Sequence, residues 1–303
     1  DGTIVDAKTT RMKESIQGAF VYEPKPGLYK DIVLFDFRSL YPTIICAHNL
    51  GPGSFMKEGC KNPKEVPGRE QYWFCEDEKS FLPMVLENLI LRRSEVKKQI
   101  KKKPSRLLEA RSYALKILGN SFYGYLAFYG ARWYSFESAA STTAYARDYI
   151  QKTIAKAQKD GFEVVYSDTD SCFLLLGEKK MDEAMKFMKR VNKDLPGHME
   201  LEYEGHFTRG IFVALKGSDK GAKKKYALIR EDGSMKITGF ETVRRNWSDM
   251  AKNVQKEVLR MVLSGKEEEA VEHVKDVLSS LRDGAVDLNQ LVMRTQLTRP
   301  LSK

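Results

Sequence analysis

Three aspartates stand at the ends of apolar runs in the sequence. Asp36 follows the run at 32–35, and Asp168 and Asp170 lie one residue apart in VVYSDTDSCFLLL (164–176). Carboxylates this close repel one another and lose hydration on burial, so they need a solvated turn or a cation. Taken singly, each fits a turn or a helix N-cap. Together, at strand ends, they form an oxygen site suited to Mg²⁺, which can hold two ions about 3.5–4 Å apart.

Basic residues at helical spacing could bind phosphate groups opposite these carboxylates. Lys116, Asn120 and Tyr123 lie at positions i, i+4 and i+7, and Arg93 and Lys97 lie at i and i+4. Each set therefore shares one face of its helix. Two such faces, opposed to one another, could close on a triphosphate. The alternative is two solvated helix faces, which is the more common fate of helical charges.

The elements that position these residues follow from periodicity and turn residues. We predict a strand at 32–37, a Gly- and Pro-rich loop at 51–79, and two long helices, from Pro83 to 103 and at 105–122, separated by Pro104. The predicted fold class is α+β, with helical lobes attached to a strand-based centre. The remaining predictions are helices around 137–159 and 180–194, strands at 162–167 and 171–176 about a tight turn, strands and loops at 200–240, and helices at 241–282.

Composition narrows the class of protein. The 303 residues carry 51 Lys and Arg against 41 Asp and Glu, a net charge of +10 that suits a polyanionic partner or, alternatively, only solubility. No apolar run reaches the roughly 18 residues that span a membrane, so we expect no membrane partner. The opening residues lack a methionine and a signal-peptide pattern. We therefore expect part of a longer protein.

The four cysteines leave their redox state open. Cys46, Cys60, Cys75 and Cys172 show no CxxC spacing, so we expect no zinc site. Cys60 and Cys75 bracket a loop in which a disulfide is geometrically possible. Free thiols are the default in intracellular proteins, except in those of hyperthermophiles.

Five segments, in order, resemble motifs of the family B DNA polymerases of archaeal type. DFRSLYP (36–42), KILGNSFYG (116–124) and YSDTDS (166–171) resemble motifs A, B and C, and KKKYA (223–227) and VRRNWS (243–248) resemble motifs at the palm–thumb junction. The resemblance runs from about Gly18 to Lys303. It implies an antiparallel-sheet palm with inserted helical-hairpin fingers and a partial helical thumb. The implied divisions are 1–82 for linker and first part of the palm, 83–128 for fingers, 129–212 for the second part of the palm, 213–240 for the palm–thumb junction and 241–303 for the partial thumb.

The resemblance also implies an activity and its residues. The chain would be a DNA-templated polymerase core that adds deoxynucleoside monophosphates from dNTPs to a primer 3′-hydroxyl and releases pyrophosphate. Two Mg²⁺ ions, for which Mn²⁺ could substitute, would bind Asp36, Asp170 and the Phe37 carbonyl, with Asp168 close by. Tyr41 would exclude a 2′-hydroxyl, and Lys116 would clamp the triphosphate and is a candidate to protonate the pyrophosphate. The implied nucleotide-binding residues are Phe37, Arg38, Ser39, Leu40, Tyr41, Arg93, Lys97, Lys116, Asn120 and Tyr123. The implied DNA-binding residues are Gly124, Thr169, Lys224, Lys225, Tyr226, Arg244 and Arg245.

The resemblance covers part of a polymerase. Nothing before Asp36 matches the acidic motifs of a 3′–5′ exonuclease, so we expect the N-terminal, exonuclease and remaining thumb domains of the parent polymerase to be partners outside this chain. The expected partners also include primer–template DNA, and the expected location is cytoplasmic and nucleoid-associated. Only Cys60 and Cys75 could match a disulfide of relatives. One alternative is an inactive or weakly active fragment that binds primer–template. Another is an RNA-synthesising or nucleotide-cyclising palm protein, against which Tyr41 and the helix around Lys116 argue.

Overall fold

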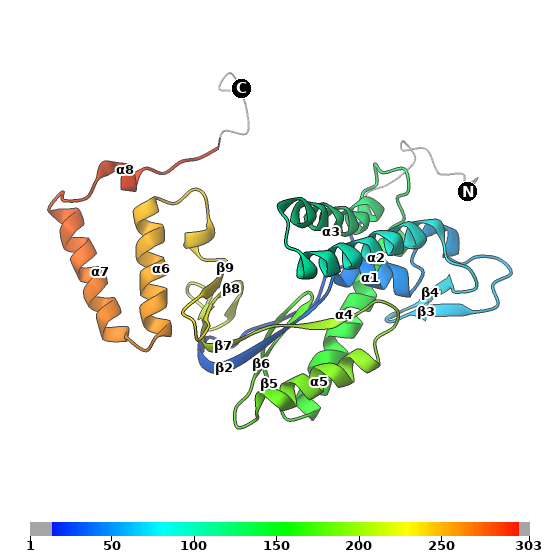
Figure 1. Cartoon of the computed structure of the whole chain (residues 1–303), viewed down its shortest axis with the longest axis horizontal. Helices are drawn as coiled ribbons and strands as arrows, with labels where there is room; N and C mark the ends of the chain where they lie inside the picture. The colour runs from blue at the N-terminus through cyan, green and yellow to red at the C-terminus, as the bar shows by residue number, and fades with distance from the viewer. Residues whose placement is uncertain (1–13, 297–303) are drawn as a thin grey trace, which may run out of the picture.

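The computed structural model describes residues 14–296, and its centre is a curled antiparallel sheet (Figure 1). The strands pair in the order β1-β5-β6-β2-β7-β8-β9, and every pairing is antiparallel. The predicted strands at 32–37, 162–167 and 171–176 are therefore present. The strands are β1 (Val21–Tyr22), β2 (Gly27–Phe37), β5 (Glu163–Asp168), β6 (Ser171–Leu175), β7 (Leu201–Ala214), β8 (Gly221–Ile229) and β9 (Met235–Thr238).

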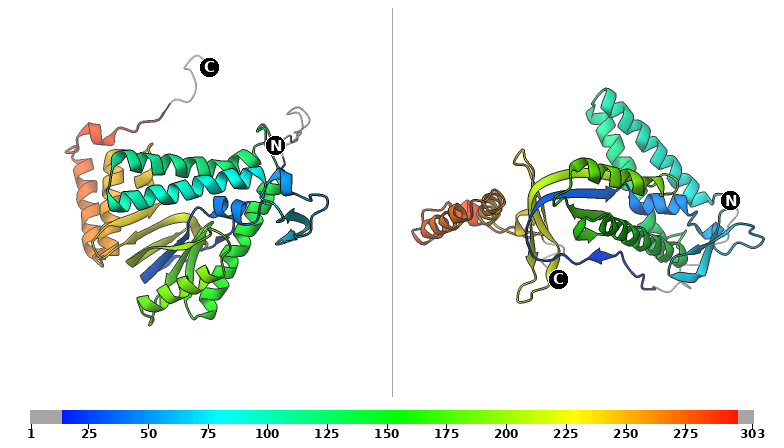
Figure 2. Two further views of the ribbon diagram at one scale, coloured as in Figure 1. Left: turned by 45° about the vertical axis from the view of Figure 1, so that its right-hand side comes forward. Right: turned by 90° about the horizontal axis from the view of Figure 1, so that it is seen from below.

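The central strand β2 is apolar on both faces because each face packs against a separate core. Val33, Phe35 and Phe37 join a cluster with α4 (Phe136–Lys159) and α5 (Met181–Lys193), which lie against one face of the sheet (Figure 2). Ile32 and Leu34 point to the opposite face and join an aromatic cluster built by β5, β6, β7 and β8. Side chains alternate along a strand, so Asp36 lies on the same face as Ile32 and Leu34, away from α4 and α5.

The two predicted long helices form an antiparallel hairpin, α2 (Phe81–Lys102) and α3 (Arg106–Ala127). Pro104 lies in the turn between them, where a missing N–H costs nothing. The short helix α1 (Leu40–Ala47) follows β2 directly and carries the hairpin, because its Ile45 packs in one cluster with Leu86 and Leu126. The hairpin is thereby held above the end of β2 at which Asp36 stands.

The prediction of a loop over 51–79 is wrong in part. The structure contains a 3-10 turn (η2, Pro52–Ser54) and a two-stranded sheet, β3 (Pro63–Val66) and β4 (Arg69–Cys75). The aromatic run YWF within β4 favours a strand, and Gly68, at φ 68°, makes the turn between the two strands. The surrounding Gly and Pro residues outweighed this pattern in the prediction.

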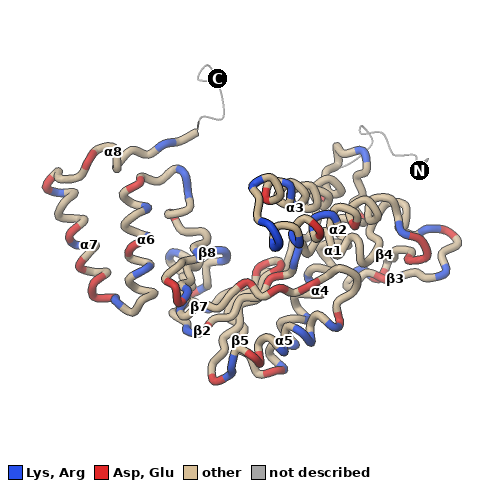
Figure 3. The backbone as a smooth tube through the Cα atoms, in the orientation of Figure 1, with Lys and Arg blue, Asp and Glu red and all other residues tan. Residues whose placement is uncertain are grey.

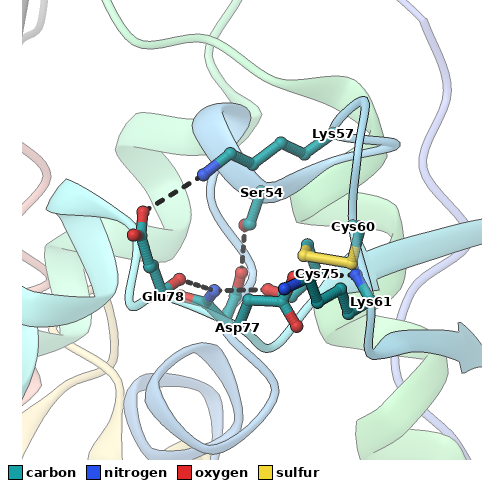
Figure 4. The surroundings of a disulfide bond; sticks show 8 residues. Ser54, Lys57, Cys60, Lys61, Cys75, Asp77 and Glu78 are labelled. Atoms are coloured by element: carbon teal, nitrogen blue, oxygen red, sulfur yellow. Dashed lines mark hydrogen bonds and ion pairs between the residues drawn. A yellow bond between two sulfur atoms is a disulfide. The ribbon is translucent and has the colours of Figure 1, made fainter.

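A disulfide joins Cys60 to Cys75, with the two Cα atoms 5.8 Å apart (Figure 4). It links the loop before β3 to the end of β4. The carboxylate of Asp77 accepts a hydrogen bond from the Lys61 backbone N–H at 2.8 Å beside it. The other two cysteines are buried free thiols. The pairing of Cys60 with Cys75, which the sequence left open, is therefore present in the structure.

The C-terminal part is helical, as predicted for 241–282, but its first long helix begins later than expected. A 3-10 turn, η3 (Glu241–Val243), precedes α6 (Asp249–Leu263), α7 (Glu267–Arg282) and α8 (Leu288–Leu291). The Ser248 hydroxyl accepts a hydrogen bond from the Ala251 N–H and so sets the start of α6. Leu259 and Leu263 attach α6 to β8. The outer ends of the predicted segments 1–82 and 241–303, residues 1–13 and 297–303, lie outside the described residues.

Within 14–296, none of the helices combines the length and the apolar character needed to cross a lipid bilayer.

Candidate active site

The three predicted carboxylates lie side by side at one edge of the sheet. Ser171 pairs with Asp36 across β2–β6 and with Asp168 across β5–β6. The Phe37 N–H donates to the Asp170 carbonyl oxygen at 2.8 Å. The turn between β5 and β6 is therefore bonded directly to the end of β2, as the strand-end pattern predicted.

Two of the three carboxylates resist ionisation. Burial, followed by the charge of Asp170, raises the pKa of Asp36 to about 7. Burial, followed by the charge of Asp168, raises the pKa of Asp170 to about 6. Asp168 has local partners instead, because the Thr169 hydroxyl donates to it at 3.1 Å and the Lys224 ammonium lies 3.4 Å away. The three carboxylates together thus carry more negative charge than the cation beside them, Lys224, neutralises.

This donor set fits a divalent cation at Asp36 and Asp170. Both are hard oxygen donors on neighbouring strands, and bound positive charge would relieve the repulsion between them. Among the described residues, one group of three His, Cys, Asp or Glu side chains brings its potential ligand atoms close together, namely Cys60, Cys75 and Asp77. Two of these three residues form the disulfide. Asp36, Asp168 and Asp170 therefore do not form such a compact group.

An open cleft of about 410 Å³ lies over these carboxylates. The predicted basic faces of α2 and α3 meet in it, so Arg93, Lys97 and Lys116 do oppose the acidic strand ends as expected. Figure 3 shows Lys and Arg along the α2–α3 hairpin and Asp and Glu on the strands beneath it. The cleft is lined by Asp36, Phe37, Arg38, Ser39, Leu40, Tyr41, Pro42, Arg93, Lys97, Lys116, Asn120, Thr169, Asp170 and Glu202.

The basic residues of the cleft differ in how far they are already neutralised. Arg38 Nη1 lies 2.6 Å from Glu200 and 3.3 Å from Glu202. Lys97 lies 4.0 Å from Glu202. Arg93 donates to the Ser39 hydroxyl at 3.3 Å, while its Nε is buried without a hydrogen-bond partner among the described residues. A buried, unsatisfied guanidinium donor is costly, and an anion in the cleft would satisfy it.

The start of α1 faces the same cleft. Ser39, its N-cap, has a left-handed backbone with φ 51°, and its side chain makes no capping hydrogen bond. The first turn of α1 also carries no acidic residue. Its amides and its positive dipole end therefore suit an anionic group.

Tyr41 and Tyr123 form one aromatic unit beside the cleft. Their ring centroids are 4.6 Å apart in an edge-on arrangement. Burial raises the pKa of Tyr41 to about 12, with Tyr123 as the next contribution, so the hydroxyl stays neutral. A neutral ring at this place can act by its shape.

The predicted DNA-binding residues do not form one uniform surface. Arg244 and Arg245 are exposed. Gly124 has open space beside it, because a Cβ atom added there would have no other described atom within 4 Å. Lys225 is paired with Glu241 at 2.9 Å and lies over the Phe240 ring, 5.2 Å from its centroid.

The prediction for Tyr226 needs a correction. Only 7% of this residue is exposed, and its ring packs against Phe173 and Phe212 in the aromatic cluster. The alternation of side chains along β8 turns Tyr226 into the core, so we assign it a structural role.

Sequence reasoning missed the glutamates that face the site. Glu202 pairs in register with Asp36, and Glu204 pairs with Lys236 of β9 in a short ion pair. Their alternation in ELEYEG (200–205) is typical of one strand face, but their ion-pair partners come from distant segments.

An acidic sheet edge is thus opposed by a basic helical hairpin across one cleft. The family model described as DNA polymerase family B matches residues 1–303, and the chain belongs to this family. It is 42% identical to the DNA polymerase of Pyrococcus glycovorans over 96% of its length, and 42% identical to that of Thermococcus gorgonarius over 98%.

A solved structure supports the same assignment. The family B DNA polymerase of the hyperthermophilic archaeon Pyrobaculum calidifontis superposes with a TM-score of 0.73 at 33% identity, covering 99% of this chain and 39% of that one. The chain spans 38% of the length of the Pyrococcus glycovorans and Thermococcus gorgonarius relatives.

Proposed function

We propose that this chain is the catalytic core of a DNA-templated DNA polymerase, with a palm (up to 82 and 129–212), fingers (83–128), a palm–thumb junction (213–240) and part of a thumb (from 241). The observation that carries the proposal is the opposition of two poorly ionised carboxylates, Asp36 and Asp170, to the cations of α2 and α3 in one cleft. The substrates are dNTPs and a primer 3′-hydroxyl, and the product is pyrophosphate beside the extended primer.

The acidic side of the cleft would hold Mg²⁺, or Mn²⁺ in its place. Asp36, Asp170 and the Phe37 carbonyl are the proposed ligands, and Asp168, held by Lys224, lies beside the primer end. Divalent cations bound there supply the positive charge that phosphoryl transfer needs at its attacking and leaving oxygens.

The basic side of the cleft would hold the triphosphate. Arg93, Lys97 and Lys116 line it together with Ser39 and the N-terminal turn of α1. Fixed donors of this kind stabilise the charge that spreads over the transferring phosphoryl group and the leaving pyrophosphate. Lys116 is the proposed proton donor to pyrophosphate. Asn120 lies one helical turn further along α3, towards the nascent base pair.

The DNA contacts that we propose come from both sides of the cleft. Thr169 and Lys224 lie near the primer end, Gly124 leaves room for the template base, and Arg244 and Arg245 reach phosphates of the duplex. Lys225 would exchange its contact with Glu241 for a phosphate. Such contacts position the duplex without reading its sequence.

A second candidate function is binding of primer–template without turnover, for which the exposed Arg244 and Arg245 and the cations of the cleft would supply the phosphate contacts. The close pair Tyr41 and Tyr123 argues against an RNA-synthesising palm, because it narrows the space beside the sugar.

Primer extension separates the two candidates. The chain, in excess over a fluorescent primer–template, is mixed with Mg²⁺ and the next correct dNTP, and the primer is resolved by length. Extension by one nucleotide supports the enzyme, whereas a gel shift without extension supports the binding fragment. Neither extension nor shift at low salt would contradict both.

A further inference from the structure

Arg147 of α4 donates hydrogen bonds to a backbone segment that lies outside the motifs described in the sequence. Its Nη1 donates to the carbonyl oxygens of Gln17 at 3.0 Å and Gly18 at 2.8 Å. The electrostatic partners of the guanidinium are Arg69, Tyr41 and Tyr123, with no carboxylate among them. Among the described residues, the guanidinium therefore donates hydrogen bonds to backbone carbonyls and interacts electrostatically with Tyr41 and Tyr123, and it forms no ion pair with a carboxylate.

The segment 17–22, which we call the strap, continues from these hydrogen bonds to the catalytic turn. The Phe20 carbonyl accepts a hydrogen bond from the Thr169 N–H at 3.1 Å. Val21 then pairs in register with Asp168, and Tyr22 with Ser167. The strap is thus bonded to α4 at one end and to the aspartate-bearing turn at the other.

The turn needs such support. Thr169 stands between the two aspartates with φ 57°, a left-handed conformation that is unfavourable for a β-branched residue. Strained backbone persists only where its surroundings hold it. The hydrogen bond from the Thr169 amide to the strap is the contact that does this from outside the β5–β6 hairpin.

The same guanidinium acts electrostatically on the Tyr41–Tyr123 pair beside the cleft. Burial raises the pKa of both Tyr41 and Tyr123, and the Arg147 charge opposes this rise in both. One side chain therefore donates hydrogen bonds to the strap and interacts electrostatically with the two rings, whose centroids are 4.6 Å apart.

We propose that Arg147 is a positioning residue that, through the strap, sets the catalytic turn of Asp168 and Asp170 relative to the Tyr41–Tyr123 pair. The inference deepens the proposed polymerase function and rests on it for its kinetic consequence. Its structural consequence is independent of that function. Loss of Arg147 releases the strap, and the Thr169 amide then loses its acceptor.

Hydrogen exchange of the Thr169 amide tests the structural consequence without DNA or nucleotide. In Arg147→Met we expect this amide to exchange about tenfold faster, as for the loss of a charge-assisted hydrogen bond. Lys152→Met, which removes an exposed cation from the same helix, should leave the rate unchanged. In Arg147→Ala, added guanidinium ion should restore slow exchange. Unchanged Thr169 exchange in Arg147→Met, or equally faster exchange across the whole sheet, would overturn the proposal.

Kinetics test the positioning role in the same variants. In Arg147→Met we expect single-nucleotide kcat to fall roughly 10- to 100-fold, as for a small misplacement of reacting groups, with KM for the dNTP nearly unchanged. Preference for deoxy- over ribonucleotides should fall as well, because the turn and the aromatic pair lose their fixed spacing. A rise in KM with normal kcat and normal sugar preference would contradict a positioning role. Absence of extension by the unmodified chain would count against the polymerase function, while the exchange result still decides the role of Arg147.

Discussion

Neutralising Asp36 should stabilise the metal-free protein while it removes function. The folded-state pKa of Asp36 is about 7 against an ordinary 3.8, so between these pH values the folded state retains a proton that the unfolded state has released. The free energy of unfolding therefore falls as pH rises through this window, and the cost is complete above pH 7. A shift of this size corresponds to about 4 kcal/mol. Because a buried amide is also costly, we expect Asp36→Asn to gain about 2–4 kcal/mol at pH 8.

Urea unfolding in the presence of a chelator measures this gain. At pH 4.5, just above the unfolded-state pKa, the same variant should gain about 3 kcal/mol less than at pH 8, since folded Asp36 is then mostly protonated. Mg²⁺ should stabilise the unmodified chain and have less effect on Asp36→Asn. Asp219→Asn, an exposed aspartate in the β7–β8 turn, is the matched control and should show no gain at either pH. Destabilisation of Asp36→Asn at pH 8, or an equal gain at both pH values, would refute the reasoning.

Three further predictions concern single features of the structure. Tyr41→Ala should raise the ratio of kcat/KM for ribonucleotides to that for deoxyribonucleotides, whereas Tyr41→Phe should not; an unchanged ratio in Tyr41→Ala would remove the ring from sugar selection. Burial lowers the pKa of His48 to about 4 from 6.5, so its contribution to the free energy of unfolding should be lost as pH falls from 6.5 to 4, by up to about 3 kcal/mol, and His48→Phe should lack this component in urea titrations. Reduction of Cys60–Cys75, which closes a loop of 15 residues, should cost about 3 kcal/mol in thermal melts, and thiol counting under denaturing, non-reducing conditions should find two free thiols, with four contradicting the bridge.

The part of the site that local patterns describe could be predicted from the sequence. Asp36 and Asp170 end or follow apolar strands, and residues at strand ends reach a common edge when the strands pair. The faces of α2 and α3 followed from i, i+4 spacing, because helix geometry fixes which side chains lie together. Whether those faces met over the carboxylates depended on α1, whose packing joins segments far apart in the chain.

The rest depends on contacts between distant segments, which local spacing does not encode. Arg38, an implied nucleotide-binding residue, lines the cleft, but its ion pairs with Glu200 and with Glu202 of β7 could not be read from local spacing. Tyr226 follows three lysines and resembled a DNA contact, but the pairing of β8 with β7 turns its ring into the core. Arg147 lies in a helix without a motif, and its role emerges only where the strap passes it.

The central claim is that Asp36 and Asp170 hold the metal ions of a nucleotidyl transfer site, and single-turnover incorporation tests it most directly. The unmodified chain, Asp36→Ala, Asp170→Ala and the control Asp219→Ala are each mixed with saturating primer–template, Mg²⁺ and the correct dNTP, beside circular dichroism melts and a DNA-binding titration. We predict that both active-site variants lose incorporation while they keep their fold and most of their affinity for DNA, and that Asp219→Ala behaves like the unmodified chain. Near-normal incorporation by either Asp36→Ala or Asp170→Ala would contradict the claim.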